Sequence, residues 1–477
     1  MGRCLLNIEN QDNFLEFGRF YIEGFHEALM HGALKREDGV TYLLVHNTAP
    51  ECEPYLDHLE PPRYITGELH DGVLVRLGGL NFSPTHWDYN DAYTVNELLV
   101  TNLPGFDATF WHTEMLFTTV EFRIPHVSKW LDGRVPLNRE NELPTVFNIT
   151  GIDAVLSFEQ GENESYPSPL HTLIERYIKI KLTYQQAKSV LEIRSNINIL
   201  RDFFSLFFAG NVWINQVTLY DYATPFRLFV REHLGPVPEI NSQQQVLQYS
   251  EIAPYMEPVF NRLFEEKESV LTRQFQYLLH PYLTNSVRVE DIAFGALRLF
   301  EVIYEVIEEN NINDYYQKVR YVWATLNQAI PNLDIKQDQE SIRAVASVRN
   351  DLGHWNVSNL ITGYNEQRDI EVLTHRVVGL CRAYYFLRLT LPPKIVLKQL
   401  FENGDFHRDL FRRDFLGWKV SLKFMPGDCV ILRTIYEEVS EKGERLHAVR
   451  LKEEETFPEL SEEGAYFSPV RYKINGK

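Results

Sequence analysis

An arginine and a histidine lie five residues apart in the segment Arg349-Asn350-Asp351-Leu352-Gly353-His354. Arginine keeps its positive charge at physiological pH, whereas histidine gains and loses a proton near neutrality. Together they suit cleavage of a phosphodiester without a metal ion, because the guanidinium can stabilise charge on the phosphate while the imidazole transfers the proton. The alternative is a helix end that carries a surface arginine and a half-buried histidine.

The helix that leads into this segment decides whether the two side chains can meet. Ile342, Val345 and Val348 recur at helical spacing and predict a helix over residues 338–352, with Gly353 at the position of a left-handed C-terminal cap. In an unbroken helix, residues five positions apart point about 140° away from each other. A break at Gly353 lets the chain turn, so that both side chains can face one cleft.

Two neighbouring residues extend this candidate site. Asn350 could orient the imidazole or contact a phosphate, and Trp355 could cover the site or stack on an RNA base. Plain packing in the protein interior is the alternative for Trp355.

Residues 255–403 are predicted to be mainly helical. Apolar residues recur at helical spacing in four segments, at residues 289–308, 315–329, 338–352 and 370–389. Long helices joined by short connections are typical of an antiparallel bundle.

Residues 1–235 are predicted to be mainly strands. Short β-branched segments lie at residues 73–77 and 118–124, and polar and apolar residues alternate from 176 to 182. Residues 190–194 are predicted to be a strand that pairs with the last of these, followed by a helix over residues 198–209. Together they predict a sandwich-like β-rich domain with one or two helices.

The domain boundaries follow from composition. A Pro-flanked, Ser/Gln-rich stretch predicts a linker over residues 236–254, and residues 416–477 are again β-rich and acidic. We therefore expect an α+β multidomain protein with a β-rich domain (1–235), a linker (236–254), a helical domain (255–415) and a C-terminal extension (416–477).

Composition places the chain among ordinary globular proteins, with 44% hydrophobic and 24% charged residues in 477. The sequence has no apolar run of membrane-spanning length and no signal peptide at its start, so a cytoplasmic location is expected. Its four cysteines are far apart, and no metal-binding, cofactor-binding or phosphate-loop motif is present. We expect no cofactor and no metal.

The charge balance bears on a nucleic-acid partner in two ways. The formal net charge of -19 argues against nucleic-acid binding by the whole chain. Residues 341–420, however, contain 12 Lys and Arg against 8 Asp and Glu. The segment around Arg349 is therefore locally basic, which is compatible with an RNA site.

A second basic stretch lies at residues 406–418. Arg408, Arg412 and Arg413 alternate there with aromatic residues. Cations beside stacking platforms are typical of single-stranded RNA binding. An amphipathic helix that closes the bundle is the alternative.

The arrangement resembles a known superfamily. A four-helix bundle with R-N-x-x-x-H after its third helix, here Arg349 to His354, is similar to the HEPN superfamily, whose active members are metal-independent endoribonucleases. The β-rich region in front, with residues 120–124 leading to Trp130-Leu131, resembles the N-terminal domain of the ApeA-type abortive-infection proteins. That family joins such a domain to a HEPN domain in bacterial anti-phage defence. The extension after about residue 415 matches neither.

The resemblance implies a function and a set of roles. Arg349 and His354 match the catalytic pair, Asn350 is the polar neighbour, and Glu301 stands where many HEPN helices carry an acid that could hold the arginine; an ordinary surface acid is the alternative. It also implies RNA (single-stranded or in tRNA loops) as substrate and a homodimer or higher even-numbered oligomer with paired motifs. On this hypothesis the β-rich region either senses a phage protein as the trigger or holds the nuclease silent.

A different class of function remains open from the sequence. The acidic charge and the large β-rich region also suit a non-catalytic interaction or sensor protein, in which the helical bundle serves dimerisation.

Overall fold

The structure is a computed structural model of the 477-residue chain. It describes residues 14–22, 29–37, 39–48, 64–70, 72–82, 91–101, 115–131, 145–168, 171–221, 224–230, 247, 249–284, 289–308, 314–330, 333–335, 342, 345–346, 348–350, 352, 367–402, 420–424, 437–439, 445–447, 465–466 and 470–472. The chain forms two compact units, one of residues 1–137, 152–198 and 213–237, the other of residues 138–151, 199–212 and 238–477.

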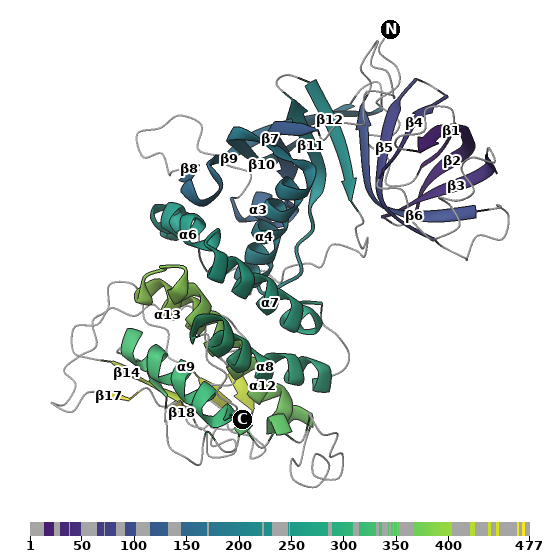
Figure 1. Cartoon of the computed structure of the whole chain (residues 1–477). Coiled ribbons are helices and arrows are strands. Elements are labelled where there is room, and N and C mark those ends of the chain that lie inside the picture. Colours follow the sequence, from purple (N-terminus) through teal and green to yellow (C-terminus); the bar gives the residue numbers. More distant parts are fainter. Residues whose placement is uncertain are drawn as a thin grey trace. The chain divides into compact units, whose positions relative to one another are not determined.

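The first unit begins with a closed barrel. Its strands are β1 (Phe14–Ile22), β2 (Leu29–Glu37), β3 (Val40–Thr48), β4 (Tyr64–Leu69), β5 (Leu74–Phe82) and β6 (Asp91–Thr101). They follow the order β3-β2-β1-β4-β5-β6, and β3 pairs with β6 to close the sheet on itself (Figure 1). Alternate side chains of these strands, among them Phe20, Leu43 and Leu77, point inward and form one buried core.

A bulge in β2 bends the barrel wall. The register between β2 and β3 shifts between His31 and Gly32. A Cβ atom on Gly32 would lie 2.3 Å from the carbonyl oxygen of Leu44, so a side chain at this position would collide with the neighbouring strand. Bulges and glycines of this kind bend strands to close a barrel.

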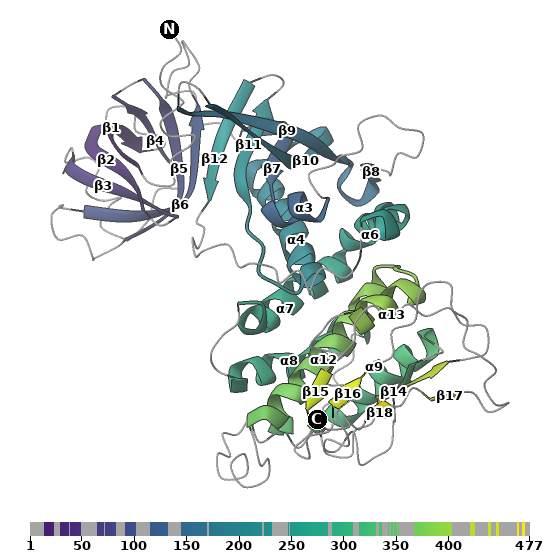
Figure 2. The same cartoon turned by 180° about the vertical axis from the view of Figure 1, so that it is seen from behind.

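The sheet continues beyond the barrel through β6. The next strands are β12 (Thr224–Val230), β11 (Asn215–Asp221), β7 (Leu116–Arg123), β10 (His171–Ser189) and β9 (Ala154–Ser168), each antiparallel to its neighbour. The short helix α3 (Pro125–Trp130) packs against β10. The expected β-rich region is confirmed. Its strands form one continuous antiparallel sheet that is closed at one end, where a sandwich-like arrangement was expected (Figure 2).

One sequence prediction in this region is wrong. Residues 190–194 were expected to form a strand, but they are the first turns of helix α4 (Val190–Phe208). Ser189 caps this helix: its hydroxyl accepts from Glu192 N at 3.3 Å, and Glu192 Oε2 accepts from Ser189 N at 2.9 Å. The reciprocal capping box satisfies free N–H groups at the helix start, which outweighs the β-branched character of Val190 and Ile193.

Ser189→Ala is expected to lower the free energy of unfolding by about 1 kcal/mol, because the Glu192 N–H then loses its acceptor. Ser189→Thr, which keeps the hydroxyl, serves as the control. The hydrogen bond from the Ser189 backbone N–H lowers the pKa of Glu192 below its usual value of 4.5. The stabilisation that the Glu192 carboxylate adds through this hydrogen bond is therefore present above pH 4.5 and is lost as the pH falls through the lowered pKa. Equal urea midpoints for Ser189→Ala and the parent protein would contradict the capping role.

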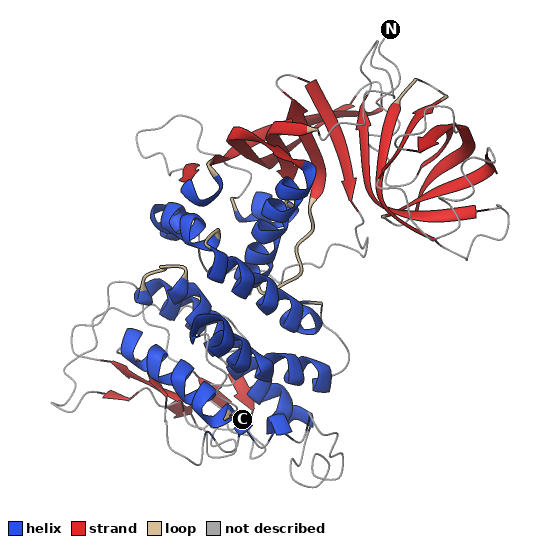
Figure 3. Ribbon diagram, viewed as in Figure 1, coloured by secondary structure: helices blue, strands red, loops and turns tan. Residues whose placement is uncertain are grey.

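The second unit is mainly helical (Figure 3). Its helices include α5 (Tyr249–Ile252), η4 (Ala253–Tyr255), α6 (Met256–Leu263), α7 (Glu266–Leu283), α8 (Val289–Glu308), α9 (Tyr315–Ala329), α12 (Gln367–Arg388) and α13 (Pro393–Glu402). Helix α8 packs against α7, α9 and α12, and α9 also packs against α12. The predicted bundle helices over residues 289–308 and 315–329 are confirmed to the residue, and the one predicted from 370 begins at Gln367.

Buried side chains of the bundle hold these helices together. Trp323 of α9 and Tyr385 of α12 are fully buried, as is Phe300 of α8. Arg382 and Gln399 donate to the carbonyl oxygens of Leu206 and Phe207 at the end of α4, where a helix leaves carbonyls unpaired. The last turns of α4 are therefore part of this unit.

Two further segments complete the second unit. Strand β8 (Val146–Ile149) packs on α6, and η3 (Thr150–Ile152) follows it. Within the linker predicted for residues 236–254, Leu247, Tyr249 and Ile252 are buried. The linker therefore does not extend to residue 254, because these side chains contribute to the core.

The C-terminal extension contains short strands, as predicted. They are β14 (Val420–Phe424), β15 (Glu437–Val439), β16 (Arg445–His447), β17 (Ala465–Tyr466) and β18 (Val470–Tyr472). β14 pairs with β13 (Leu333–Ile335), which follows α9, and with β17; β15, β16 and β18 form another small sheet. None of the helices that the structure describes is long and apolar enough to cross a membrane.

Candidate functional site

Arg349 is bound to Glu301 of α8 in the described part of the bundle. Arg349 Nε and NH2 donate to Glu301 Oε1 at 2.9 and 2.6 Å. The two side chains are half-buried, with 28% and 15% of their surfaces exposed. Of the two alternatives for Glu301, the structure has the acid that holds the arginine, because both donors on one edge of the guanidinium reach it.

Residues 342, 345–346, 348–350 and 352 of the predicted third helix are described, and all are helical. Ile342, Val345 and Val348 are buried, as their helical spacing predicted. Arg349 is half-buried beside this apolar stripe, whereas Asn350 is exposed. The helix thus anchors itself by its apolar face and places Arg349 at the edge of the core.

The ring of Tyr315 also lies near the guanidinium of Arg349. Its ring centroid lies 5.6 Å from Arg349 Cζ, a cation–π distance, and its hydroxyl donates to the carbonyl oxygen of Leu297 in α8 at 2.9 Å. Burial raises the pKa of Tyr315 well above its usual value of 10, so the phenol stays neutral and acts as a donor. The sequence analysis missed Tyr315, because an aromatic residue at a helix start usually signals core packing.

Among the residues that the structure describes, Asn350 is the one further acceptor for the remaining donors of Arg349. A guanidinium has five N–H donors, and Glu301 occupies only the edge formed by Nε and NH2. NH1 donates to Asn350 Oδ1 at 3.3 Å, a long and weaker contact. Arg298, one turn before Glu301, lies 3.8 Å from Glu301 Oε2. Binding of a phosphate oxygen by NH1 would leave the hydrogen bonds from Nε and NH2 to Glu301 intact.

Several predicted site residues fall outside the described residues. His354 and Trp355 are among them, and so are the basic residues Arg408, Arg412 and Arg413. The structure thus places Arg349, Asn350 and Glu301 together, and the functional roles of all these residues stay predictions.

The described residues also contain a buried carboxylate that the sequence analysis did not single out. Glu268 of α7 has 2% of its side chain exposed, and its Oε1 accepts from Arg262 NH2 at 3.0 Å and from Arg388 NH2. Arg262 also pairs with Glu265. The signal was weak in the sequence, because a glutamate in the first turn of a helix is usually a solvated residue near the helix dipole. Among the described residues, no group of three or more His, Cys, Asp or Glu side chains could hold a metal ion.

Comparison with known families concerns the region in front of the bundle. Residues 35–231, from β2 to the end of the sheet, match the sequence model of the ApeA N-terminal domain 1. This region is an ApeA N-terminal domain. The resemblance of the β-rich region to the N-terminal domain of the ApeA-type abortive-infection proteins is thereby confirmed. The ApeA domain comprises most of the barrel, all of the remaining strands of the sheet, and α3 and α4.

The other comparisons give no match. No curated protein and no solved structure is similar to the chain at a significant level. The family assignment therefore rests on the ApeA domain, and the helical unit is interpreted from its own residues.

Proposed function

We propose that this ApeA-type protein is a metal-independent endoribonuclease of a bacterial anti-phage abortive-infection system, with a HEPN-like active site at Arg349 and His354. The observation that carries the proposal is the anchoring of Arg349 by Glu301 and Tyr315 inside a helical unit that accompanies an ApeA domain. A surface arginine at a helix end needs no such support. A group that must meet a phosphate at a fixed position does.

The proposed chemistry uses the two side chains in different roles. His354 removes the proton from a ribose 2′-hydroxyl, and the resulting oxygen attacks the adjacent phosphorus. Arg349 stabilises the negative charge that builds on the phosphoryl oxygens. The P–O5′ bond breaks, and the leaving oxygen receives a proton from the matching motif of a second copy of the chain. The products are a 2′,3′-cyclic phosphate and a 5′-hydroxyl.

The experiment that tests this function uses purified protein and a labelled single-stranded RNA or tRNA, in the presence of EDTA. We expect cleavage that is unaffected by the chelator, ends in a cyclic phosphate, and stops when the nucleotide before the cleaved bond is replaced by its 2′-deoxy form. A cleavage product that carries a 5′-phosphate, or equal cleavage of the deoxy substrate, would contradict the proposed mechanism.

A second candidate is a non-catalytic sensor or interaction protein. Two charge observations favour it: Glu301 neutralises Arg349, and the whole chain has a formal net charge of -19. In that case the ion pair only joins the third bundle helix to α8. Protection against phage that persists in His354→Ala would favour this candidate.

A further inference from the structure

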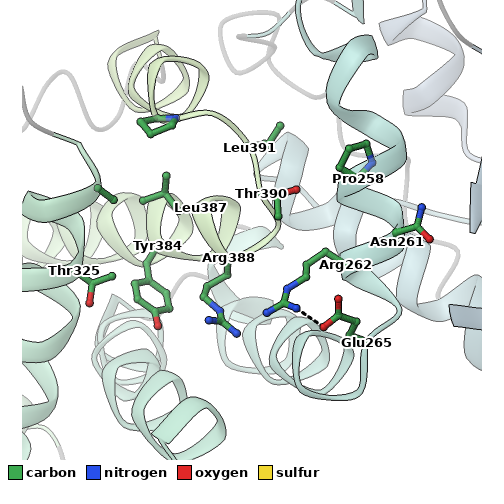
Figure 4. A pocket seen from close by; sticks show the side chains of 12 residues that line it. Pro258, Asn261, Arg262, Glu265, Thr325, Tyr384, Leu387, Arg388, Thr390 and Leu391 are labelled. Carbon is green, nitrogen blue, oxygen red and sulfur yellow. Dashed lines mark hydrogen bonds and ion pairs between the residues drawn. The ribbon is translucent and has the colours of Figure 1, made fainter. Parts of the chain in front are cut away.

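An open cavity of about 660 Å³ lies in the helical unit, and neither Arg349 nor Glu301 lines it. Its walls come from α6, α9, the end of α12 and the turn into α13 (Figure 4). Pockets for small organic ligands have volumes of roughly 300–1,000 Å³. The cavity therefore has the size of a small-molecule site.

The cavity wall combines an apolar surface with two guanidinium groups. Apolar walls come from Pro258, Ala329, Leu387 and Leu391. Arg262 and Arg388 extend into the same space from α6 and α12, as Figure 4 shows. An apolar body with an anionic group would match both kinds of surface.

The two guanidiniums share one buried carboxylate. Arg262 NH2 and Arg388 NH2 both donate to the same oxygen of Glu268, Oε1. No other acceptor for Arg388 is found in the segments that the structure describes, although 28% of its side chain is exposed. Glu268 thus holds both cations in place and, together with Glu265 at Arg262, balances their charge. Arg388 has to share Glu268 with Arg262, so its other N–H groups can donate to an anion.

Glu265 is the one carboxylate on the cavity wall among the described residues. It pairs with Arg262 NH1, and half of its side chain is exposed to solvent, which screens its charge. Its negative charge should weaken the binding of an anion but not prevent it. Removing the charge of Glu265 should therefore strengthen the binding of an anion, whereas removing the charge of Arg388 should weaken it.

The turn between α12 and α13, which lines the cavity, has a strained backbone. Thr390, which lines the cavity, has a φ of 67°. Leu391 N donates to Phe386 O, and Thr390 N donates to Leu387 O, as in a helix end that favours glycine. A β-branched residue in this conformation costs about 1–3 kcal/mol. Strain of this kind gathers at ligand sites, which agrees with a binding role for this wall.

We propose that this cavity binds a small organic anion, which places its anionic group at Arg388 and Arg262 and packs a flat apolar body against Leu387, Leu391 and Ala329. The shared chemistry is a sulfonate, phosphate or carboxylate on an aromatic body. The site is distinct from the proposed nuclease site in its residues and in its chemistry, so it does not depend on RNA cleavage.

The test uses two fluorescent probes with the same apolar body. 8-Anilinonaphthalene-1-sulfonate carries one negative charge, and N-phenyl-1-naphthylamine is its neutral counterpart. We expect the full-length protein to bind the sulfonate at one saturable site, at least about tenfold more tightly than the neutral probe, because hydrogen bonds to a charged group are among the stronger ones. Equal affinity for the two probes, or no saturable binding of the sulfonate, would overturn the proposal.

Four variants assign the binding to this cavity. Arg388→Gln should weaken sulfonate binding about tenfold without affecting the neutral probe, and Glu265→Gln should strengthen it. Ala329→Phe, which fills the cavity without touching an ion pair, should weaken both probes. Arg320→Gln removes an exposed charge elsewhere on α9 and should change neither. Circular dichroism confirms that each variant is folded; sulfonate binding unaffected by Ala329→Phe in folded protein would place the probe elsewhere.

Discussion

Arg349→Ala is expected to lower the rate of RNA cleavage by about 10²–10³-fold, since a positioned group that stabilises transition-state charge contributes about that much. His354→Ala is expected to lower it by about 10²–10⁴-fold, the usual contribution of proton transfer by a positioned side chain. The rates are measured with purified protein on labelled RNA, and protection is measured as survival of infected cells that carry each variant. Both variants should lose protection together with cleavage.

The matched control for this prediction is Arg320→Ala. Arg320 is an exposed arginine on α9, so its removal changes the net charge by the same amount and leaves the site intact. Glu301→Gln should lower the rate less than Arg349→Ala, because a neutral amide can still accept from Arg349 but holds it less firmly. Folded Arg349→Ala protein that cleaves RNA at the rate of the parent would show that the motif is not the active site.

Glu268→Gln is expected to lower the free energy of unfolding of the helical unit by about 2–3 kcal/mol. Breaking a fully buried ion pair costs about 3–5 kcal/mol, and the loss should be smaller here because Arg262 and Arg388 keep partial contact with water. The change leaves Arg262 with Glu265 as its carboxylate partner and removes the carboxylate that Arg388 shared with it. The measurement is urea denaturation followed by tryptophan fluorescence, which reports on the buried Trp323.

The control for this second prediction is Glu266→Gln, two residues earlier in the same helix turn. Glu266 is exposed and interacts mainly with the helix dipole, so its loss should cost less than 1 kcal/mol. A cost for Glu268→Gln no larger than that for Glu266→Gln would show that the buried carboxylate does not stabilise the bundle.

The contrast between α8 and α4 shows where sequence patterns suffice. Residues 289–308 carry a long apolar stripe with helical spacing, and the structure places α8 over the same residues. Residues 190–194 are too short to show a period, and their β-branched residues favoured a strand. The capping box of Ser189 and Glu192 was present in the sequence and was the stronger signal, because it satisfies backbone groups that a strand would leave to its neighbours.

The barrel illustrates what strand patterns leave open. Alternating residues predict strands that bury one face, but a flat, sandwiched or closed sheet can each bury that face. The closing pair of β3 and β6 joins residues about fifty positions apart, such as Thr41 and Val95. Their pairing depends on the bend of the whole sheet, which no local pattern records.

By itself, the sequence determined the α+β multidomain class, the bundle helices α8 and α9, the ApeA-type N-terminal region, and Arg349 as the residue around which to search for chemistry. The fold class, the helices and Arg349 are local properties, because periodicity, helix ends and a short motif specify them within a few turns of chain. The ApeA-type region came instead from a resemblance to a known family. Only the tertiary structure decided that Glu301 and Tyr315 hold Arg349, that Glu268 is buried between Arg262 and Arg388, and that a cavity lies beside them. Contacts between side chains tens of residues apart depend on how helices pack, and the same glutamate pattern in a sequence is compatible with a solvated surface or with a buried ion pair.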